Sequence, residues 1–159
     1  HVFVPRNVAE KQVHLLNGMS TNLKKECASM LDTISDWGGI DLMVVGVGMN
    51  GHVGFNEPGV SEHLHAHVID LDEITTSVGQ KYFSTPQQLK QGITMGLQDF
   101  LESSTALMLI NGARKKEIAQ KLLLSEVTTE LPASFIKKHK NGILLMDREA
   151  GGEKLQNSY

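Results

Sequence analysis

Short apolar runs divide the chain into segments that predict β-strands. Leu42–Val45, Thr105–Ile110 and Gly142–Met146 are continuous in apolar side chains and are bounded by glycine or polar residues. Runs of this length are typical of strands buried inside a parallel sheet. Val13–Leu16, which ends at an Asn-Gly pair, predicts a further strand followed by a turn. The run Gly92–Leu97 is also β-prone despite its glycines.

Segments with helical spacing lie between these runs. Ser20 or Thr21 can cap a helix that continues through Trp37. Residues 98–103 and 131–136 predict two shorter helices, and a longer helix follows Asn111-Gly112. The apolar positions that we expect to face the core are Leu23, Cys27, Met30, Leu31 and Ile34 in the first helix and Ile118, Leu122 and Leu123 in the helix after Gly112.

This alternation of strands and helices indicates the fold class. Consecutive strand, helix and strand segments favour parallel pairing, because a helical crossover returns the chain to the same edge of the sheet. We therefore predict an α/β protein, a three-layer α/β/α arrangement with a mostly parallel Rossmann-like sheet. At 159 residues with 40% hydrophobic content, residues 1–159 are expected to form a single domain.

The loop after Leu42–Val45 is rich in glycine. Gly46, Gly48 and Gly51 match the Gly-x-Gly-x-x-Gly pattern that binds dinucleotides after a strand. That function requires a helix to begin at the glycines, yet proline follows at Pro58. Proline inside a helix costs about 3 kcal/mol relative to alanine. The sequence therefore does not favour a nicotinamide or flavin cofactor.

The same loop carries His52, Asn56 and Glu57 within six residues. Ligands of open α/β sheets bind at the carboxyl ends of strands, and glycines let backbone amides approach a ligand closely. Histidine is the side chain that titrates nearest neutrality, so the loop indicates an acid/base site beside an anionic or polyhydroxylated ligand. The alternative is a structural loop whose histidine caps a neighbouring segment.

A second strand end has similar features. Thr105–Ile110 is followed by Gly112 and then by Arg114, Lys115 and Lys116. Amides at the start of a helix together with basic side chains suit a phosphate group. The alternative is that the basic residues form a solvated helix face.

Three histidines alternate after the glycine-rich loop. On a β-strand, His63, His65 and His67 would share one face and could approach a metal ion. The sequence provides no identifiable fourth ligand, so we predict no metal and favour a polar strand face or a contact between subunits.

Charge and cysteine content narrow the class of protein. The net charge of −3 and a pI near 6.2 give no broad attraction to nucleic acid or to an anionic membrane. No apolar run approaches the roughly 20 residues of a membrane span, so no membrane association is expected. The single cysteine, Cys27, fits a small core residue in a reducing, cytoplasmic setting.

The loop from Gly46 to Gly59 resembles the signature of the glucosamine-6-phosphate deaminase (isomerase) family. The run Gly-His-x-x-Phe-Asn-Glu-Pro is its discriminating part, since the related 6-phosphogluconolactonases share Gly-His and usually lack Asn-Glu-Pro. The resemblance extends over nearly the whole chain, because Lys81-Tyr-Phe83, the segment Gly112–Lys115 and the final strand occur in the family's order.

The resemblance implies a sugar-phosphate enzyme and a role for particular residues. His52 would open the pyranose ring of an amino-sugar 6-phosphate, and Glu57 would orient its imidazole. Lys81 and Lys115 fall where the family binds phosphate. The open-chain sugar would isomerise between C1 and C2 and lose ammonia to give a ketose 6-phosphate, with no metal or organic cofactor. The remaining positions implied in substrate binding are the glycines Gly46, Gly48, Gly51 and Gly112.

Two departures from the family pattern bear on activity. Asn50, beside the catalytic histidine, stands where many members have Asp. The family's proton-abstracting Asp lies in an upstream Asp-Glu-Tyr motif, and Asp72-Glu73-Ile74 does not match it. We therefore expect the chain to correspond to the C-terminal two-thirds of a family member and not to turn over substrate alone. The substrate is expected to be glucosamine or galactosamine 6-phosphate, and association with further copies of the chain is left open. A lactonase and a non-catalytic sugar-phosphate sensor are the alternative functions.

Overall fold

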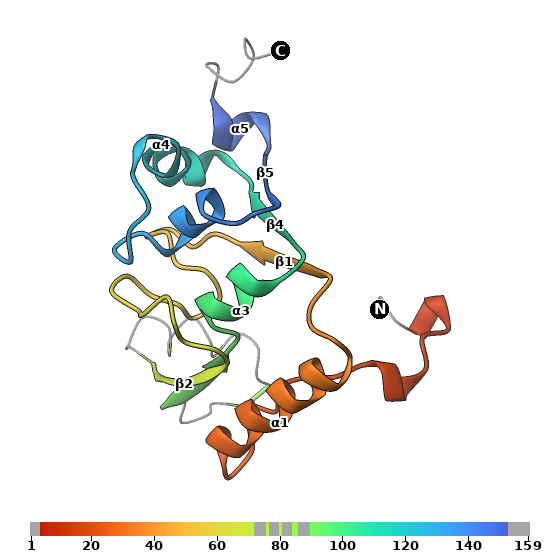
Figure 1. Cartoon of the computed structure of the whole chain (residues 1–159). Coiled ribbons are helices and arrows are strands. Elements are labelled where there is room, and N and C mark those ends of the chain that lie inside the picture. Colours follow the sequence, from red (N-terminus) through yellow and green to blue (C-terminus); the bar gives the residue numbers. More distant parts are fainter. Residues whose placement is uncertain (1–3, 72–75, 77–79, 81–83, 86–89, 153–159) are drawn as a thin grey trace.

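A three-stranded parallel sheet forms the centre of the computed structural model, which describes residues 4–71, 76, 80, 84–85 and 90–152. Its strands are β1 (Leu42–Gly46), β4 (Thr105–Ile110) and β5 (Gly142–Met146), in the order β1-β4-β5 (Figure 1). Both pairings are parallel. The three strongest apolar runs of the sequence are thus confirmed as neighbouring strands, and the α/β class with a mostly parallel sheet is confirmed.

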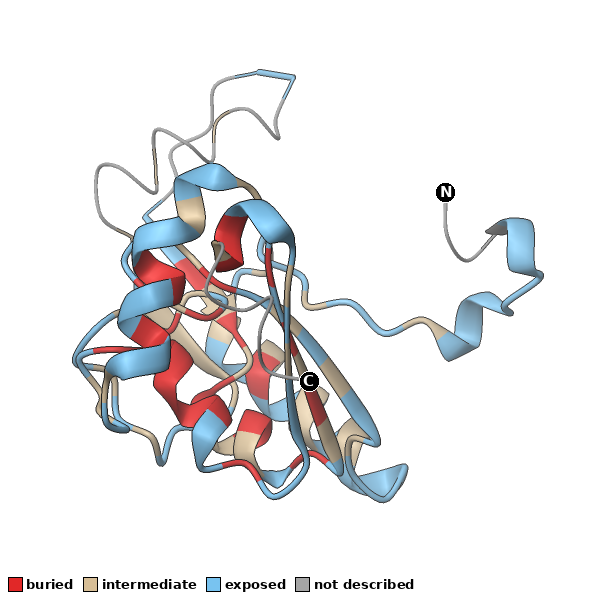
Figure 2. Ribbon diagram, turned by 90° about the horizontal axis from the view of Figure 1, so that it is seen from above, coloured by how far each residue is buried: buried red, intermediate tan, exposed pale blue. Residues whose placement is uncertain are grey.

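Helical segments after and between these strands cover one face of the sheet. They are α3 (Leu97–Glu102), α4 (Lys116–Leu124), the 3-10 segment η5 (Pro132–Lys137) and the short α5 (Arg148–Gly151). Figure 2 shows the buried residues concentrated between the helices and the strands. The core cluster includes Leu97, Phe100, Ala106, Met108, Ile110, Ile118, Leu122, Leu131 and Phe135.

A smaller two-stranded sheet lies beside the main one. Strand β2 (His67–Asp70) pairs antiparallel with β3 (Gln91–Thr94), and the helix α1 (Leu23–Asp36) packs against both strands. The helix begins after Asn22, whose side chain accepts a hydrogen bond from Lys25 N. Asn22 is therefore the cap in place of Ser20 or Thr21, which puts the start of the helix one or two positions later than predicted.

The prediction of a strand at Val13–Leu16 is wrong. This segment forms no strand, and Leu15 is 76% exposed. It follows two 3-10 turns, η1 (Val4–Arg6) and η2 (Glu10–Gln12), and these residues project from the body of the molecule (Figure 1). A strand needs a hydrogen-bonding neighbour, and the segment has none among the described residues. The expected strand–helix–strand unit is therefore not formed by this segment, α1 and β1.

Two helical predictions also need correction. Residues Pro132–Lys137 form a 3-10 segment and not an α-helix. In α4, Ile118 and Leu122 are buried as expected, but Leu123 is exposed, because it lies one position beyond the inward face. A 3-10 turn, η4 (Ala113–Lys115), precedes α4.

The lone cysteine behaves as the sequence indicates. Cys27 lies on the inner face of α1 and is buried, and this burial raises the pKa of its thiol. In the part of the chain that the structure describes, no helix is both long and apolar enough to cross a bilayer.

Candidate active site

The glycine-rich loop turns back on itself directly after β1. Gly48 N–H donates to His52 O at 2.8 Å, and Gly51 N–H donates to Gly48 O at 3.1 Å. Gly51 has a φ of 90°, a conformation that favours glycine. A Cβ on Gly48 would lie 1.2 Å from His52 Cδ2, so the imidazole lies against a position that only glycine can occupy.

Neighbouring segments hold this loop in place. Asn56 is buried, and its side-chain amide donates to Val53 O and to Met95 O, both at 2.8 Å. Phe55 N–H donates to the Thr94 hydroxyl at 3.2 Å. The anchoring roles of Thr94 and Met95 were missed in the sequence, because these residues lie about 40 positions away, at the end of β3. No local pattern relates that strand to the loop.

The loop brings the three predicted catalytic residues together. His52 Nδ1 lies 3.0 Å from Glu57 Oε1. The Asn50 side-chain amide donates to Glu57 Oε2 at 2.7 Å, and Asn50 Oδ1 accepts the His52 N–H at 3.1 Å. Asn50 therefore links the carboxylate to the backbone of the histidine. An aspartate at this position could accept from His52 N but could not donate to Glu57.

The His52 ring has one enclosed nitrogen. Its Nδ1 is buried next to the Glu57 carboxylate, but the contact is not directed well enough for a hydrogen bond. The side chains of His52 and Glu57 are each 31% exposed. A carboxylate next to Nδ1 favours a proton on that nitrogen, which leaves Nε2 to exchange a proton with a ligand.

Lys115 reaches this loop from the neighbouring strand end. Its Nζ donates to Val47 O at 2.6 Å, one residue before Gly48. Burial lowers the pKa of the Lys115 amine from its ordinary value. The two strand ends that the sequence singled out are thus joined, and a cationic group lies beside the backbone that supports His52.

The amides at Gly112 are already occupied. Gly112 N–H donates to Asp147 Oδ2 at 2.8 Å, and Ala113 N–H donates to Glu149 Oε2 at 3.2 Å. In this structure two carboxylates from the start of α5 accept from these amides, and the phosphate-binding role of Gly112 stays a prediction. Arg114 is exposed.

Other predicted positions have different outcomes. Gly46 ends β1, and Lys81 lies outside the described residues. Of the three histidines, only His67 is in a strand, and its Nδ1 donates to His65 O at 2.8 Å. His65 Nδ1 lies 2.6 Å from the buried Asp99 carboxylate. Within the described ranges, no three His, Cys, Asp or Glu side chains are grouped to hold a metal ion.

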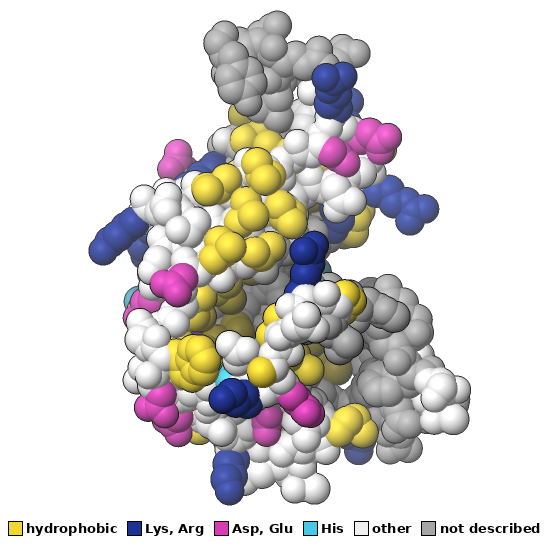
Figure 3. All heavy atoms as spheres, turned by 90° about the vertical axis from the view of Figure 1, so that its right-hand side faces the viewer, with side chains coloured by type: hydrophobic (Ala, Val, Ile, Leu, Met, Phe, Trp, Pro, Cys, Tyr) yellow, Lys and Arg dark blue, Asp and Glu magenta, His cyan; other side chains and the backbone are white. Residues whose placement is uncertain are grey.

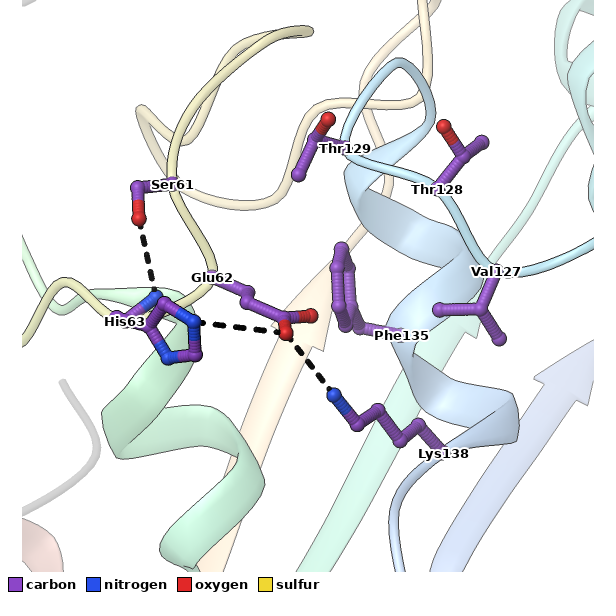
Figure 4. A pocket seen from close by; sticks show the side chains of 8 residues that line it. All are labelled: Ser61, Glu62, His63, Val127, Thr128, Thr129, Phe135 and Lys138. Atoms are coloured by element: carbon purple, nitrogen blue, oxygen red, sulfur yellow. Dashed lines mark hydrogen bonds and ion pairs between the residues drawn. The ribbon is translucent and has the colours of Figure 1, made fainter.

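A separate hollow of about 600 Å³ lies next to the end of the loop. In Figure 4, Glu62 reaches both the His63 ring and the Lys138 amine, with the Phe135 ring beside them. The carboxylate lies 3.1 Å from Lys138 Nζ. Among the residues that the structure describes, no predicted catalytic or phosphate-binding residue lines this hollow, which is bordered by Ser61, Glu62, His63, Val127, Thr128, Thr129, Phe135 and Lys138.

The fold and the loop define an α/β protein with a histidine–carboxylate site at the carboxyl end of a parallel strand. Its family is shown by comparison with known proteins. The chain belongs to the family of glucosamine-6-phosphate isomerases and 6-phosphogluconolactonases, whose model matches residues 1–145.

Individual relatives agree with this assignment. Glucosamine-6-phosphate deaminase of Shouchella clausii is 40% identical over 160 residues, which cover 100% of this chain and 63% of the relative. The corresponding protein of Oceanobacillus iheyensis is 40% identical, over 94% of this chain and 59% of its own length. The chain thus spans less than two-thirds of these relatives.

Solved structures give the same fold. A monomeric glucosamine-6-phosphate deaminase superposes with a TM-score of 0.79 at 36% identity, covering 90% of this chain and 60% of that protein. The 6-phosphogluconolactonase of Trypanosoma brucei superposes with a TM-score of 0.60 at 14% identity, covering 88% of this chain and 57% of that protein. At this low identity the lactonase shares the fold alone.

Proposed function

We propose that this chain carries the ring-opening and phosphate-binding groups of an amino-sugar-6-phosphate deaminase/isomerase. The observation that carries the proposal is the grouping of His52, Glu57 and Asn50 around one loop, with Lys115 bound to the same loop. The deaminase names of the relatives at 40% identity support the same substrate class.

Ring opening is the step that these residues can perform. His52 Nε2 accepts the proton of the anomeric hydroxyl and returns it to the ring oxygen as the bond between C1 and that oxygen breaks, which leaves an aldehyde at C1. The Glu57 carboxylate stabilises the imidazolium that forms between the two transfers. Asn50 fixes the carboxylate by its hydrogen bond, so that the ring and the acid keep their relative position.

The phosphate is assigned to the cationic side of the site. Lys115 Nζ exchanges its contact with Val47 O for a phosphate oxygen, so that its charge is paired with an opposite charge. Lys81 is the second proposed phosphate ligand. Backbone amides of the loop glycines complete the proposed substrate contacts.

The complete reaction requires more than ring opening and phosphate binding. In the proposed sequence the open-chain sugar moves a proton from C2 to C1, and water then releases ammonia and leaves a ketose 6-phosphate. The phosphorylated sugar and the single, buried cysteine, Cys27, fit a cytoplasmic setting for this reaction.

The test is the rate at which the two anomers of glucosamine 6-phosphate interconvert, measured by exchange NMR. This reaction needs ring opening alone. We expect the chain to accelerate it by about 100-fold over buffer, as is typical of general acid–base catalysis. His52→Asn should return the rate to that of buffer. His63→Asn is the matched control, since the side chain of His63 is 81% exposed and its Nε2 lies 3.8 Å from Glu62 Oε1.

Equal rates for the unmodified chain and His52→Asn would contradict the proposal. The same two proteins are then assayed with galactosamine 6-phosphate and with 6-phosphogluconolactone. Acid release from the lactone that depends on His52 would support the lactonase alternative, and binding without any catalysed exchange would support a sugar-phosphate sensor.

A further inference from the structure

The turn between β3 and α3, residues 94–96, binds the glycine-rich loop on one side. The side-chain amide of the buried Asn56 donates to Met95 O at 2.8 Å. Phe55 N–H donates to the Thr94 hydroxyl at 3.2 Å. Two consecutive residues of the loop are therefore bonded to the turn, so a displacement of the turn would displace the loop.

The segment that leaves the loop binds the start of α3 from another side. Gln98 N–H donates to Leu64 O at 3.0 Å, and His65 Nδ1 lies 2.6 Å from Asp99 Oδ1. A Cβ on Gly96 would lie 1.8 Å from Leu64 O, so glycine is required for this close approach. The turn and the first residues of α3 are thus held between the loop and the segment that follows it.

Asp99 connects these contacts. Its Oδ2 accepts the Gly96 N–H at 2.8 Å, while its Oδ1 faces His65. Figure 3 shows Asp and Glu side chains scattered over the molecular surface, and of the acidic residues that the structure describes only Asp99 is buried. Burial of a carboxylate is unfavourable unless its oxygens are paired. The Gly96 amide and His65 therefore determine where this carboxylate lies.

His65 is held on its backbone as well as through its ring. His67 Nδ1 donates to His65 O at 2.8 Å, and His67 is the cross-strand partner of Thr94 in the pairing of β2 with β3. The side chain of His65 is 45% exposed, whereas its partner Asp99 is enclosed. Two of the three alternating histidines thus contact the turn that supports the loop.

We propose that His65 and Asp99 are positioning residues for the glycine-rich loop. Their pair holds the turn 94–96 in place. The turn orients Glu57, because Asn56, which is bonded to Met95, is the preceding residue. Both residues act through the loop and not on the sugar. This inference rests on the proposed function, since the orientation of Glu57 affects catalysis only if the loop reacts with the sugar.

The first measurement is hydrogen exchange of the Phe55 amide, followed by NMR without substrate. His65→Ala leaves the buried Asp99 carboxylate without its side-chain partner, so the exchange should become about tenfold faster. Thr94→Val removes the acceptor of the Phe55 amide but keeps the branched shape, and it is the reference for complete loss of that contact. His63→Ala is the matched control, since it lies in the same segment and its side chain is 81% exposed.

The second measurement is the rate of anomer exchange as a function of the concentration of glucosamine 6-phosphate. Misorientation of Glu57 affects proton transfer more than binding. His65→Ala should therefore lower the maximal rate about tenfold and change the half-saturating concentration by less than about twofold. His65→Asn places an amide donor near the position of Nδ1 and should restore most of the rate. Circular dichroism gives the folded fraction to which each rate is scaled.

Two results would overturn the proposal. One is unchanged exchange of the Phe55 amide in His65→Ala. The other is an unchanged maximal rate in that variant although its Phe55 amide exchanges faster. Failure of the proposed function looks different, because the unmodified chain would then catalyse no anomer exchange. The Phe55 measurement needs no substrate, and it would still decide whether the pair of His65 and Asp99 holds the loop.

Discussion

The two glycine-bearing ends of β1 and β4 look alike in sequence but differ in the structure. Each follows a strand of the parallel sheet, and each leads into polar side chains. At the end of β1, Asn50 and Glu57 surround a histidine whose ring stays partly exposed. At the end of β4, the carboxylates of Asp147 and Glu149 occupy the amides.

A strand–glycine–polar pattern therefore does not by itself define an open site. The β1 loop obtains its partners from within a few residues, so its chemistry can be predicted locally. The β4 end obtains its partners from about 35 residues later, and these are acidic. What remains available at β4 is the side chain of Lys115, which extends toward the other strand end.

The largest expected effect comes from Gly48→Ala, which tests whether the β1 end is built around the imidazole. A methyl group there would overlap the His52 ring, and displacement of a catalytic group by about 1 Å can cost about 100-fold in rate. We expect anomer exchange to fall by that factor in exchange NMR. Gly18→Ala is the control, because nothing lies within 4 Å of its added methyl group.

An unchanged rate in Gly48→Ala would show that the position of the His52 ring is not important for the reaction. The β1 end would then differ from the β4 end in geometry but not in function.

Lys115→Met tests whether the β4 end contributes to substrate binding through the Lys115 side chain. Loss of one charge-assisted contact should weaken the binding of glucosamine 6-phosphate about tenfold, as measured by calorimetry. Because burial lowers the pKa of Lys115, its charge is lost at lower pH than that of an exposed lysine, and affinity should fall as pH rises through that value. The exposed Lys116→Met serves as the matched control, and equal affinities would exclude a phosphate role for Lys115.

Asp147→Ser tests whether the β4 end can be opened to a ligand. Serine can still cap α5 at Ala150 N, but it removes the charge from the Gly112 amide. One charge at about 4 Å in water is worth about 1 kcal/mol, so the affinity for inorganic phosphate should rise about fivefold. A lower affinity, measured by calorimetry, would mean that Asp147 positions the phosphate site and does not obstruct it.

The smallest expected effect comes from Asn50→Asp. The substitution replaces the donor to Glu57 by a second carboxylate, and like charges this close favour retention of a proton. The pH at which the rate of anomer exchange falls on the acid side of its profile should therefore rise by about one pH unit. Asn50→Ala, which removes the donor without adding charge, should leave this pH unchanged.

The fold could be predicted where a segment's apolar pattern matched its surroundings. Strands β1, β4 and β5 were recognisable because each is a short apolar run, and in the structure these runs pair with one another in the parallel sheet. Val13–Leu16 is also a mostly apolar run, but no strand lies beside it in the described structure, and strand pairing is not visible in a single sequence. Leu123 lies one position too far round its helix to face the core, a distinction that apolar spacing alone does not make.

The candidate site shows the same limit. The contacts among Asn50, His52 and Glu57 lie within one short loop, so their grouping could be predicted from spacing and from resemblance. The anchoring of the loop by Thr94 and Met95 could not, because it depends on the packing of β3 against the loop. Occupation of the Gly112 amide likewise depends on the tertiary position of α5.

The decisive measurement is a crystal structure of the chain soaked with glucosamine 6-phosphate. We expect the anomeric oxygen within hydrogen-bonding distance of His52 Nε2 and the phosphate on Lys115 Nζ. Sugar bound instead in the hollow between Glu62 and Lys138, with His52 free of ligand, would contradict the proposed site.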